Sequence, residues 1–464
     1  MFSEYGDDSV AQLGGVHLAA EQASQILTKV LERGRLAAYL EQSTRYVPYD
    51  DRPGGRYRYH VPPEADRACL GDRFRQTCDL TFDTYARWLG PLQDLFRERF
   101  PKDPADSDGV YRATIRAKAC DTLRGLLPAA ARTHVGMYAT AQSYESLLLR
   151  MRAHPLEEVR AYGDAMLTEL RKVIPAFLTR VDKPDRGGAW SEYLAATRES
   201  AGDATAKALA GLVVEEPEPS GEDVSLVWFD PEGETKVVAA AMYPHANVSH
   251  ERLLEVARAM SGDERNAILR AAIGERTNRR HRPGRAFEAT SYRFDVLCDY
   301  GAFRDLQRHR LLTVDWQHLT PEHGAAVPQE IEDLGAAADW TEVLDASRVL
   351  WDELGSACGP DVAQYAVAMA FRVRFVMDMN AREALHLIEL RSSPQGHPAY
   401  RRVAWRMHDL IRDVAGHRAI ADAMTFVDRS DVDLERLEAE RRGEARREAA
   451  LRKAERPASD AARM

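Results

Sequence analysis

The chain has 464 residues, of which 45% are hydrophobic and 29% are charged, and its formal net charge is −10. This length exceeds the usual size of one hydrophobic core, so the sequence predicts two domains or one duplicated domain. The composition is typical of a globular protein, and the acidic balance argues against a broad nucleic-acid surface while leaving room for a local basic pocket.

Membrane, secreted and metal-binding classes are not favoured by the sequence. No apolar run approaches membrane-spanning length, and the first residues, MFSEYGDDSV, lack the basic and apolar segments of a secretion signal. The five cysteines are an odd number without metal-ligand spacing, which favours reduced thiols. We therefore expect a cytoplasmic protein with no metal site, no membrane contact and no nucleic-acid partner.

The first half of the chain is expected to be nearly all α-helical. Apolar residues recur at helical spacing over residues 16–31, and long amphipathic stretches follow at about 64–100 and 111–178. The clearest break is the acidic, proline-containing segment 213–223, which predicts a linker.

Strands are expected after this linker. Residues 225–229 (SLVWF) predict a strand, residues 230–233 a turn, and residues 235–238 a further strand or the start of a helix. A second strand is predicted over 289–297, and helices then resume from residue 302 to beyond 417. The segment 431–464 has dense mixed charge and few apolar residues, which predicts a solvated helix or a disordered tail.

One sequence pattern occurs twice, and each copy lacks what the other keeps. Residues 33–46 read RGRLAAYLEQSTRY, and residues 308–320 read RHRLLTVDWQHLT. Both resemble the signature of flavin-dependent thymidylate synthases, in which Arg-His-Arg leads into Ser-x-Asn-Glu-x-Ser-x-Arg-Tyr. The first copy has lost the histidine of the triplet but keeps the Glu, Ser, Arg and Tyr. The second copy keeps the triplet and loses the rest.

Further elements of the same family follow in order. Residues 123–128 (LRGLLP) resemble its Arg-x-x-Leu-Pro helix start, and residues 285–288 (RAFE) stand where it has a Phe-Glu-His element. Its motif Arg-Ser-Leu-x-His-Phe-x-x-x-Arg is matched weakly by residues 143–150 and closely by residues 380–391 (NAREALHLIELR). The resemblance covers about 15–180 and 223–430. Each motif alone would also suit a charged, solvent-exposed helix end, so their common order carries the interpretation.

By this resemblance the chain is an α+β protein of two tandem, mostly helical domains that form a pseudo-dimer. The expected boundaries are 1–212 for a degenerate domain with a nucleotide-phosphate half-site, 213–223 for the linker, 224–430 for a domain with an FAD half-site, and 431–464 for a charged tail. A homodimer would restore the four domains of the family's tetramer. Leu147, Leu148, Leu387 and Ile388 are candidate buried faces, either in that interface or within one chain.

The resemblance also assigns roles to residues at one site between the two halves. The expected nucleotide ligands are Glu41, Ser43, Thr44, Arg45, Arg124, Asp305, Arg308 and Arg391. The expected FAD ligands are Glu41, Arg285, Glu288, Arg308, His309, Arg310, Asn380, Arg382 and His386. Arginine suits phosphate because its charged planar group donates parallel hydrogen bonds. Arg391 is the expected catalytic residue, because it would lie against the uracil and stabilise its deprotonated form.

The opposite pairing of half-sites is expected to be inactive. It would combine Arg33, Gly34 and Arg35 with Asp315, Trp316, His318 and Gln364. In that pairing Asp315 would repel a phosphate, and Gln364 replaces the arginine that Arg124 represents.

The resemblance implies an FAD enzyme that transfers a one-carbon unit to C5 of a uracil nucleotide, with methylene-tetrahydrofolate and NADPH as co-substrates. Two alternatives stay open. One is flavin-dependent modification of another pyrimidine nucleotide or nucleoside, since Asp305 replaces a glutamine that contacts the nucleotide in the family. The other is a noncatalytic nucleotide-binding scaffold, although a scaffold would not need the cluster of Asn380, His386 and Arg391.

Overall fold

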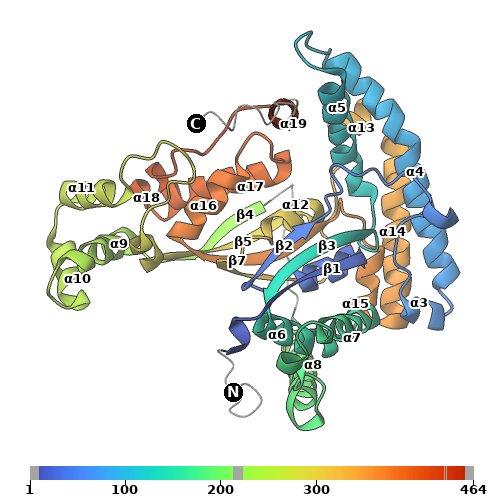
Figure 1. Cartoon of the computed structure of the whole chain (residues 1–464), viewed down its shortest axis with the longest axis horizontal. Coiled ribbons are helices and arrows are strands. Elements are labelled where there is room, and N and C mark those ends of the chain that lie inside the picture. Colours follow the sequence, from blue (N-terminus) through green and yellow to red (C-terminus); the bar gives the residue numbers. More distant parts are fainter. Residues whose placement is uncertain (1–9, 213–222, 433, 435, 455–464) are drawn as a thin grey trace, which may run out of the picture.

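The protein is built around two antiparallel sheets, one from each half of the chain (Figure 1). The computed structural model describes residues 10–212, 223–432, 434 and 436–454. The first sheet has the order β1-β3-β2 and the second β4-β5-β7-β6. The strands are β1 Gly15–Ser24, β2 Ala37–Glu41, β3 Arg132–Thr140, β4 Asp223–Phe229, β5 Ser291–Asp299, β6 Leu312–Trp316 and β7 Arg372–Asn380.

Helices surround both sheets. Those of the first half are α2 Gln25–Leu31, α3 Pro63–Arg67, α4 Gly71–Arg99, α5 Asp108–Leu123, α6 Ala141–Arg152, α7 Glu157–Arg171 and α8 Ala189–Leu209. Those of the second half are α9 Gly233–Met242, α10 His250–Ala259, α11 Gly262–Ile273, α12 Tyr300–Leu306, α13 Gln329–Asp333, α14 Ala337–Cys358, α15 Pro360–Ala363, α16 Ala381–Arg391, α17 Pro398–Asp409, α18 Arg418–Asp422 and α19 Leu437–Ala454. In Figure 1, α4, α5 and α14 stand together at one end of the molecule, and α9, α10 and α11 lie at the other.

The predicted fold class, a mostly helical α+β protein with two tandem halves, is confirmed. The same elements recur in the same order: β1, α2, β2, β3 and α6 in the first half correspond to β5, α12, β6, β7 and α16 in the second. In the first sheet β3 lies between β1 and β2, and in the second sheet β7 lies between β5 and β6. The second sheet has one further strand, β4, at its edge. The sequence repeat is therefore a repeat of structure.

The expectation of a nearly all-α first half is wrong, because residues 15–24 form a strand. Val16, Ala20 and Ala23 are the buried apolar residues of β1. A bulge between Ala20 and Ala23, with Gln22 at φ 59°, shifts the pairing with β3. The bulge gives the buried residues a spacing of four and then three, which imitates the periodicity of a helix.

Two long stretches expected to be helical are also interrupted by strands. β3 divides the stretch 111–178, and β6 and β7 divide the helical region expected after residue 302. In β3 and β7 every second residue is buried, the pattern of a central strand, and the helices on either side obscured it. The strands predicted at 225–229 and 289–297 are confirmed as β4 and β5, whereas residues 235–238 belong to helix α9.

The remaining segments differ in how far the structure tests them. Residues 213–222 of the expected linker lie outside the described residues, and Asp223 already belongs to β4. The division into domains therefore stays a prediction. The tail contains the solvated helix α19, whose Arg441 binds Asp106 beside α5 at 2.6 Å. Within the described part of the chain, no helix combines the length and apolarity needed to cross a membrane.

The four leucine and isoleucine residues considered for a subunit interface are all in the intrachain core. Leu147 is 4% exposed, and Leu148, Leu387 and Ile388 are fully buried. A homodimer would have to use other surfaces.

The two halves are joined by reciprocal backbone hydrogen bonds. The amide of Ala129 donates to the carbonyl of Val367 at 2.8 Å, and the amide of Met369 donates to the carbonyl of Leu127 at 2.9 Å. Pro128 and Ala368 form an isolated bridge between these two bonds. Each half donates one of these bonds and accepts the other, at corresponding positions. The pseudo-two-fold axis that relates the halves therefore passes through this junction.

A buried carboxylate reinforces the junction. Glu158 on α7 is 4% exposed and accepts hydrogen bonds from the Ser24 hydroxyl at 2.6 Å and the Ser24 amide at 3.0 Å. It also accepts from the Tyr365 hydroxyl of the second half at 2.7 Å. One side chain thus ties the end of β1 to the opposite half.

We expect Glu158→Leu to lower the free energy of unfolding by roughly 3 kcal/mol or more, because it leaves buried donors of Ser24 and Tyr365 without an acceptor. The neighbouring Glu157 provides a matched control, since its pair with Arg67 is largely exposed. Glu157→Gln should change stability by less than about 1 kcal/mol. Urea unfolding of the three proteins measures this, and equal losses in the two variants would contradict the role of Glu158.

Candidate functional site

Residues expected to bind the nucleotide converge where the two halves meet. Arg45 follows β2 and Arg124 follows α5 in the first half; Asp305 on α12 and Arg391 at the end of α16 come from the second. Arg391 Nη1 lies 3.4 Å from Asp305 Oδ1, and Arg124 Nη1 lies 3.9 Å from Asp305 Oδ2. Arg308 also binds Asp305. One carboxylate of the second half therefore faces arginines from both halves.

A second carboxylate, Asp121, belongs to the same cluster. Arg45 Nη2 lies 2.6 Å from Asp121 Oδ2, and Arg124 Nε lies 3.2 Å from Asp121 Oδ1. Burial alone would raise the pKa of Asp121, but Arg45, His397 and Arg124 outweigh it and hold the pKa to about 2. In the same way Arg308, Arg391 and Arg124 overcome the burial of Asp305 and keep its pKa well below the usual range.

The cluster has an excess of positive charge. It contains four guanidinium groups, those of Arg45, Arg124, Arg308 and Arg391, and two carboxylates, those of Asp121 and Asp305, so four minus two leaves a charge of +2. Arg124 Nη2 and Arg308 Nε are buried donors without a hydrogen-bond partner among the described residues. Such donors are costly unless a ligand or water accepts from them, so the cluster is suited to an anion.

Glu41 and Thr44 are held by the buried Arg304 of the second half. Arg304 Nη2 donates to Glu41 at 2.6 Å, and Arg304 Nη1 donates to Thr44 Oγ1 at 3.2 Å. Lys29 lies 3.6 Å from Glu41 and 2.7 Å from Glu32. Burial would raise the pKa of Glu41, but Arg304 and Lys29 outweigh it and lower the pKa to about 2. The two positive charges of Arg304 and Lys29 balance the two negative charges of Glu41 and Glu32. The charge of +2 on the neighbouring arginine cluster is therefore unchanged.

Ser43 lies beside this cluster in a local turn. It is half-buried, and its hydroxyl accepts a hydrogen bond from the backbone amide of Arg45 at 3.2 Å. This contact holds the segment that carries Arg45.

A cavity of about 560 Å³ opens beside the arginine cluster. Asp121 and Arg124 of the first half and Arg372 and His397 of the second half are among its lining residues. The volume lies within the range of about 300–1,000 Å³ that small-molecule sites occupy.

Arg391 is oriented through a buried histidine. Arg391 Nε donates to His309 Nε2 at 3.0 Å, and His309 Nδ1 lies 2.9 Å from Glu383 Oε1. Burial and the neighbouring Arg391 hold the pKa of His309 well below its ordinary value, so the ring is neutral. We assign the ring proton to Nδ1, which donates to Glu383, because Nε2 accepts from Arg391. Burial raises the pKa of Glu383 to about 7.

The remaining residues expected to contact FAD surround the start of α16. Asn380 caps this helix, since its side chain accepts from the Glu383 amide at 2.9 Å. Arg382 donates to the Pro283 carbonyl at 2.9 Å, and His386 Nε2 lies 3.3 Å from Arg282.

Two of the expected FAD ligands lie further out, and a third reaches across to the first half. Arg285 has an 86% exposed side chain and pairs with Glu288 at 3.0 Å. Glu288 in turn lies 3.4 Å from Arg382. Arg310 donates to the backbone carbonyl of Ala37.

His309, Glu383 and His386 have ligand atoms within 4.8 Å of one another, a geometry that could hold a metal ion. Their surroundings oppose a cation, because Arg391 and Arg282 occupy the ring nitrogens of the two histidines. Burial and the positive charge of Arg282 lower the pKa of His386 to about 4. That the protein uses no metal stays a prediction.

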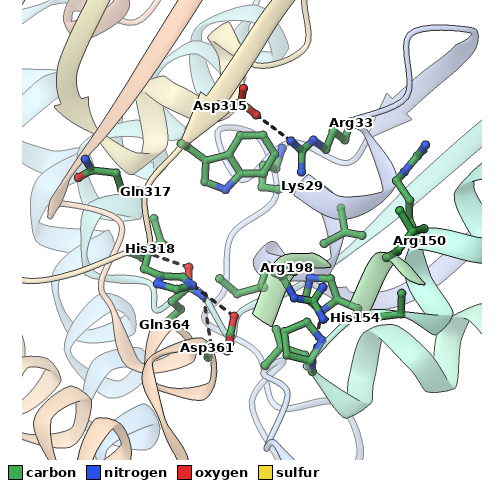
Figure 2. Close-up of a pocket in the computed structure, with 18 of the residues that line it drawn as sticks. Lys29, Arg33, Arg150, His154, Arg198, Asp315, Gln317, His318, Asp361 and Gln364 are labelled. Atoms are coloured by element: carbon green, nitrogen blue, oxygen red, sulfur yellow. Dashed lines mark hydrogen bonds and ion pairs between the residues drawn. The ribbon is translucent and has the colours of Figure 1, made fainter. Parts of the chain in front are cut away.

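The residues of the opposite pairing also come together. Arg33 Nη2 binds Asp315 Oδ1 at 2.7 Å, and Arg35 binds Thr313 at 2.8 Å. Gln364 accepts from the Leu319 amide at 3.0 Å. Figure 2 shows Arg33, Asp315, His318 and Gln364 around a separate cavity.

Several site residues were not identified from the sequence. Asp121 and Glu383 stand three residues from Arg124 and His386 on their helices, so the helical repeat places each near a named residue. Lys29 and Arg304 occupy corresponding positions before the two Arg-x-Arg triplets. His397 and Tyr400 carried no signal, because their contacts with the first half span more than 270 residues, as Tyr400 does with Arg45.

The family of the chain is shown by comparison with known sequences. The sequence model of the family described as thymidylate synthase complementing protein matches residues 1–176 and 225–416. These two regions are more than half of the chain, and the chain belongs to this family. The resemblance seen in its motifs, including its tandem arrangement, is thereby confirmed.

Two relatives match nearly the whole chain. A UPF0159 protein of Chlamydia muridarum is 38% identical over 449 residues, covering 96% of this chain and 83% of the relative. The UPF0159 protein Ta1429 of Thermoplasma acidophilum is 32% identical over 468 residues, covering 95% of this chain and 90% of the relative.

Two further matches are partial. A flavin-dependent thymidylate synthase of Clostridium tetani is 27% identical over 177 residues, covering 38% of this chain and 66% of the relative. A crystal structure of the UMP/dUMP methylase PolB from Streptomyces cacaoi bound with 5-Br dUMP has a TM-score of 0.34 and 19% identity, covering 44% of this chain and 95% of that chain.

Proposed function

We propose that the protein is a flavin-dependent enzyme that methylates C5 of a uracil nucleotide at the site built from Arg45, Arg124, Arg308 and Arg391. The observation that carries this proposal is the arginine cluster with a charge of +2 and two buried donors that have no partner among the described residues. A nucleotide phosphate carries about two negative charges near neutral pH and offers three acceptor oxygens, so it matches the cluster in charge and in hydrogen bonding.

The residues around α16 fit the phosphates of FAD. Among the described residues, Arg282 hydrogen-bonds a histidine ring and Arg310 hydrogen-bonds a backbone carbonyl, and neither forms an ion pair with a carboxylate. Arg382 and Asn380 lie at the start of the same helix, where backbone amides also favour an anion. Bound FAD, once reduced by NADPH, would supply the two electrons that convert a methylene group to a methyl group.

Arg391 is proposed to act at the uracil ring. Glu383 and His309 fix its guanidinium, and its charge would stabilise the negative charge that develops on the ring when C5 becomes nucleophilic. Asp305 touches the same guanidinium and is proposed to select the acceptor through its hydrogen bonds.

Methylene-tetrahydrofolate as carbon donor, NADPH as reductant and a homodimeric assembly complete the proposal. Modification of a different pyrimidine nucleotide or nucleoside is the second candidate, favoured by Asp305, which lies among the arginines proposed to bind the nucleotide. A nucleotide-binding scaffold is the third, and the measurements below separate it from the two enzymes.

We expect one FAD per chain, because the second half alone keeps His309, Asn380 and Arg382, whereas the first has Gly34, Thr140 and Gln142 in their places. Arg382→Gln copies the first half and should weaken flavin binding about ten-fold by removing a charged donor. Arg293→Gln, at an exposed pair with Asp378, is the control. Flavin released on denaturation is compared with protein concentration. Two flavins per chain, or a colourless protein that FAD cannot reconstitute, would contradict the assignment.

We expect Arg124→Gln to weaken binding of deoxyuridylate and uridylate about ten-fold or more, because it removes a charged hydrogen bond to the phosphate. Glutamine is the residue that the second half has at the corresponding position, Gln364. The substitution leaves Arg45 paired with Asp121. Flavin content should stay constant. Arg112→Gln on the exposed face of α5 is the control, and isothermal titration calorimetry measures all three proteins. Unchanged affinity in Arg124→Gln would remove this site as the phosphate site.

We expect Arg391→Lys to keep flavin and bind nucleotide within about ten-fold of the parent, while turnover falls about a hundred-fold. Lysine keeps the charge but cannot present a planar group to both His309 and the ring. Release of tritium from 5-tritiated deoxyuridylate and uridylate, with NADPH and methylene-tetrahydrofolate present, measures turnover. If the parent protein binds both ligands and releases tritium from neither, the scaffold is the better description.

A further inference from the structure

A second cavity between the halves is not used by the proposed reaction. Its volume is about 410 Å³, and residues of both halves line it. In Figure 2 the labelled side chains of the first half lie on one side of this cavity and those of the second half on the other. The first-half group consists of Lys29, Arg33, Arg150, His154 and Arg198. Lys29 is already paired with Glu32 and Glu41, and burial and Arg198 lower the pKa of His154 to about 4, so the arginines are the charges to consider.

The two acids in the lining are already paired. Asp315 binds Arg33 at 2.7 Å, and Asp361 lies 3.3 Å from His318. The side chain of Asp315 is 67% exposed, so it is directed largely to solvent. The repulsion of phosphate expected from Asp315 is therefore weakened by its partner and by water.

Two arginines of the lining form no ion pair with a carboxylate in the described part of the chain, although Arg198 attracts Asp361 at longer range. Arg150 Nη1 donates to the Ser146 hydroxyl at 2.9 Å, and Arg198 donates to the backbone carbonyl of Ala153 at 2.5 Å. Burial and the neighbouring Arg33 lower the pKa of the half-buried Arg150. Its charge is thus poorly solvated and repelled, a condition that a bound anion would relieve.

The catalytic arrangement of the first site is missing here. Gly34, Ser143 and Met151 take the places of His309, Glu383 and Arg391, so no histidine relay and no ring-facing arginine are present at these positions. A ligand of this cavity would be bound without being converted.

We propose that this cavity binds the phosphate group of a small organic phosphate, as a second and noncatalytic ligand site. Arg150 and Arg198 would donate to the phosphate oxygens, and the cavity has room for the organic part because its volume lies within the range of small-molecule sites. This inference is independent of the reaction proposed for the first site.

Isothermal titration calorimetry of the full chain with uridine 5′-monophosphate and with inorganic phosphate tests the inference. We expect Arg150→Gln to weaken one class of sites about ten-fold or more, while Arg124→Gln weakens the other class. Arg152→Gln is the matched control, since Arg152 stands on the same helix, pairs with Asp164 and does not line the cavity. Tighter binding of the nucleotide than of phosphate identifies an organic phosphate as the ligand.

A thermal melt completes the design, because it shows whether each variant is folded. Uridine monophosphate should raise the Tm of Arg124→Gln and Arg152→Gln through the second cavity. The inference fails if Arg150→Gln binds as the parent does, if Arg124→Gln abolishes all binding, or if inorganic phosphate binds as tightly as the nucleotide. If Arg150→Gln loses one class of sites and Arg124→Gln loses none, the second site stands and the reaction proposed for the first site fails.

Discussion

Reciprocal backbone hydrogen bonds between residues 125–130 and 365–370 hold the two halves of the chain together. They join the turns that lead into the central strand of each sheet, so they fix the position of one half relative to the other. Backbone bonds do not depend on side-chain identity, and the halves could diverge in sequence without losing this junction. Both cavities between the halves follow from this arrangement.

The arginine cluster and the second cavity, which occupy corresponding places between the halves, differ mainly in charge. At the first, Asp305 and Asp121 allow four arginines to lie close together, since unpaired guanidiniums would be costly in a largely desolvated site. At the second, Val30 occupies the place of Asp305 and Gln364 the place of Arg124. The same backbone therefore carries a dense ion network beside one cavity and a smaller cavity with two arginines outside ion pairs on the other side.

The buried network also explains why one half alone would be an incomplete site. Glu41 depends on Arg304, and Arg391 shares Asp305 with Arg124, so each half neutralises charges of the other. The tandem chain holds both contributions in one molecule. Covalent linkage keeps their effective concentration high, which subunits of a dimer achieve only by association.

The motifs of the sequence were enough to predict the family, the duplication and part of the first site, including Arg45, Arg124 and Arg391, because motif order survives even where single motifs are degenerate. It did not determine β1, since a bulge gave buried strand residues a helical spacing. It also did not determine the partners of the arginines, because Asp305, His309 and Tyr400 are brought together only by packing between distant segments. Long-range contacts leave no local periodicity, so the ion pairs, and the donors left without a partner among the described residues, could be found only from the folded structure.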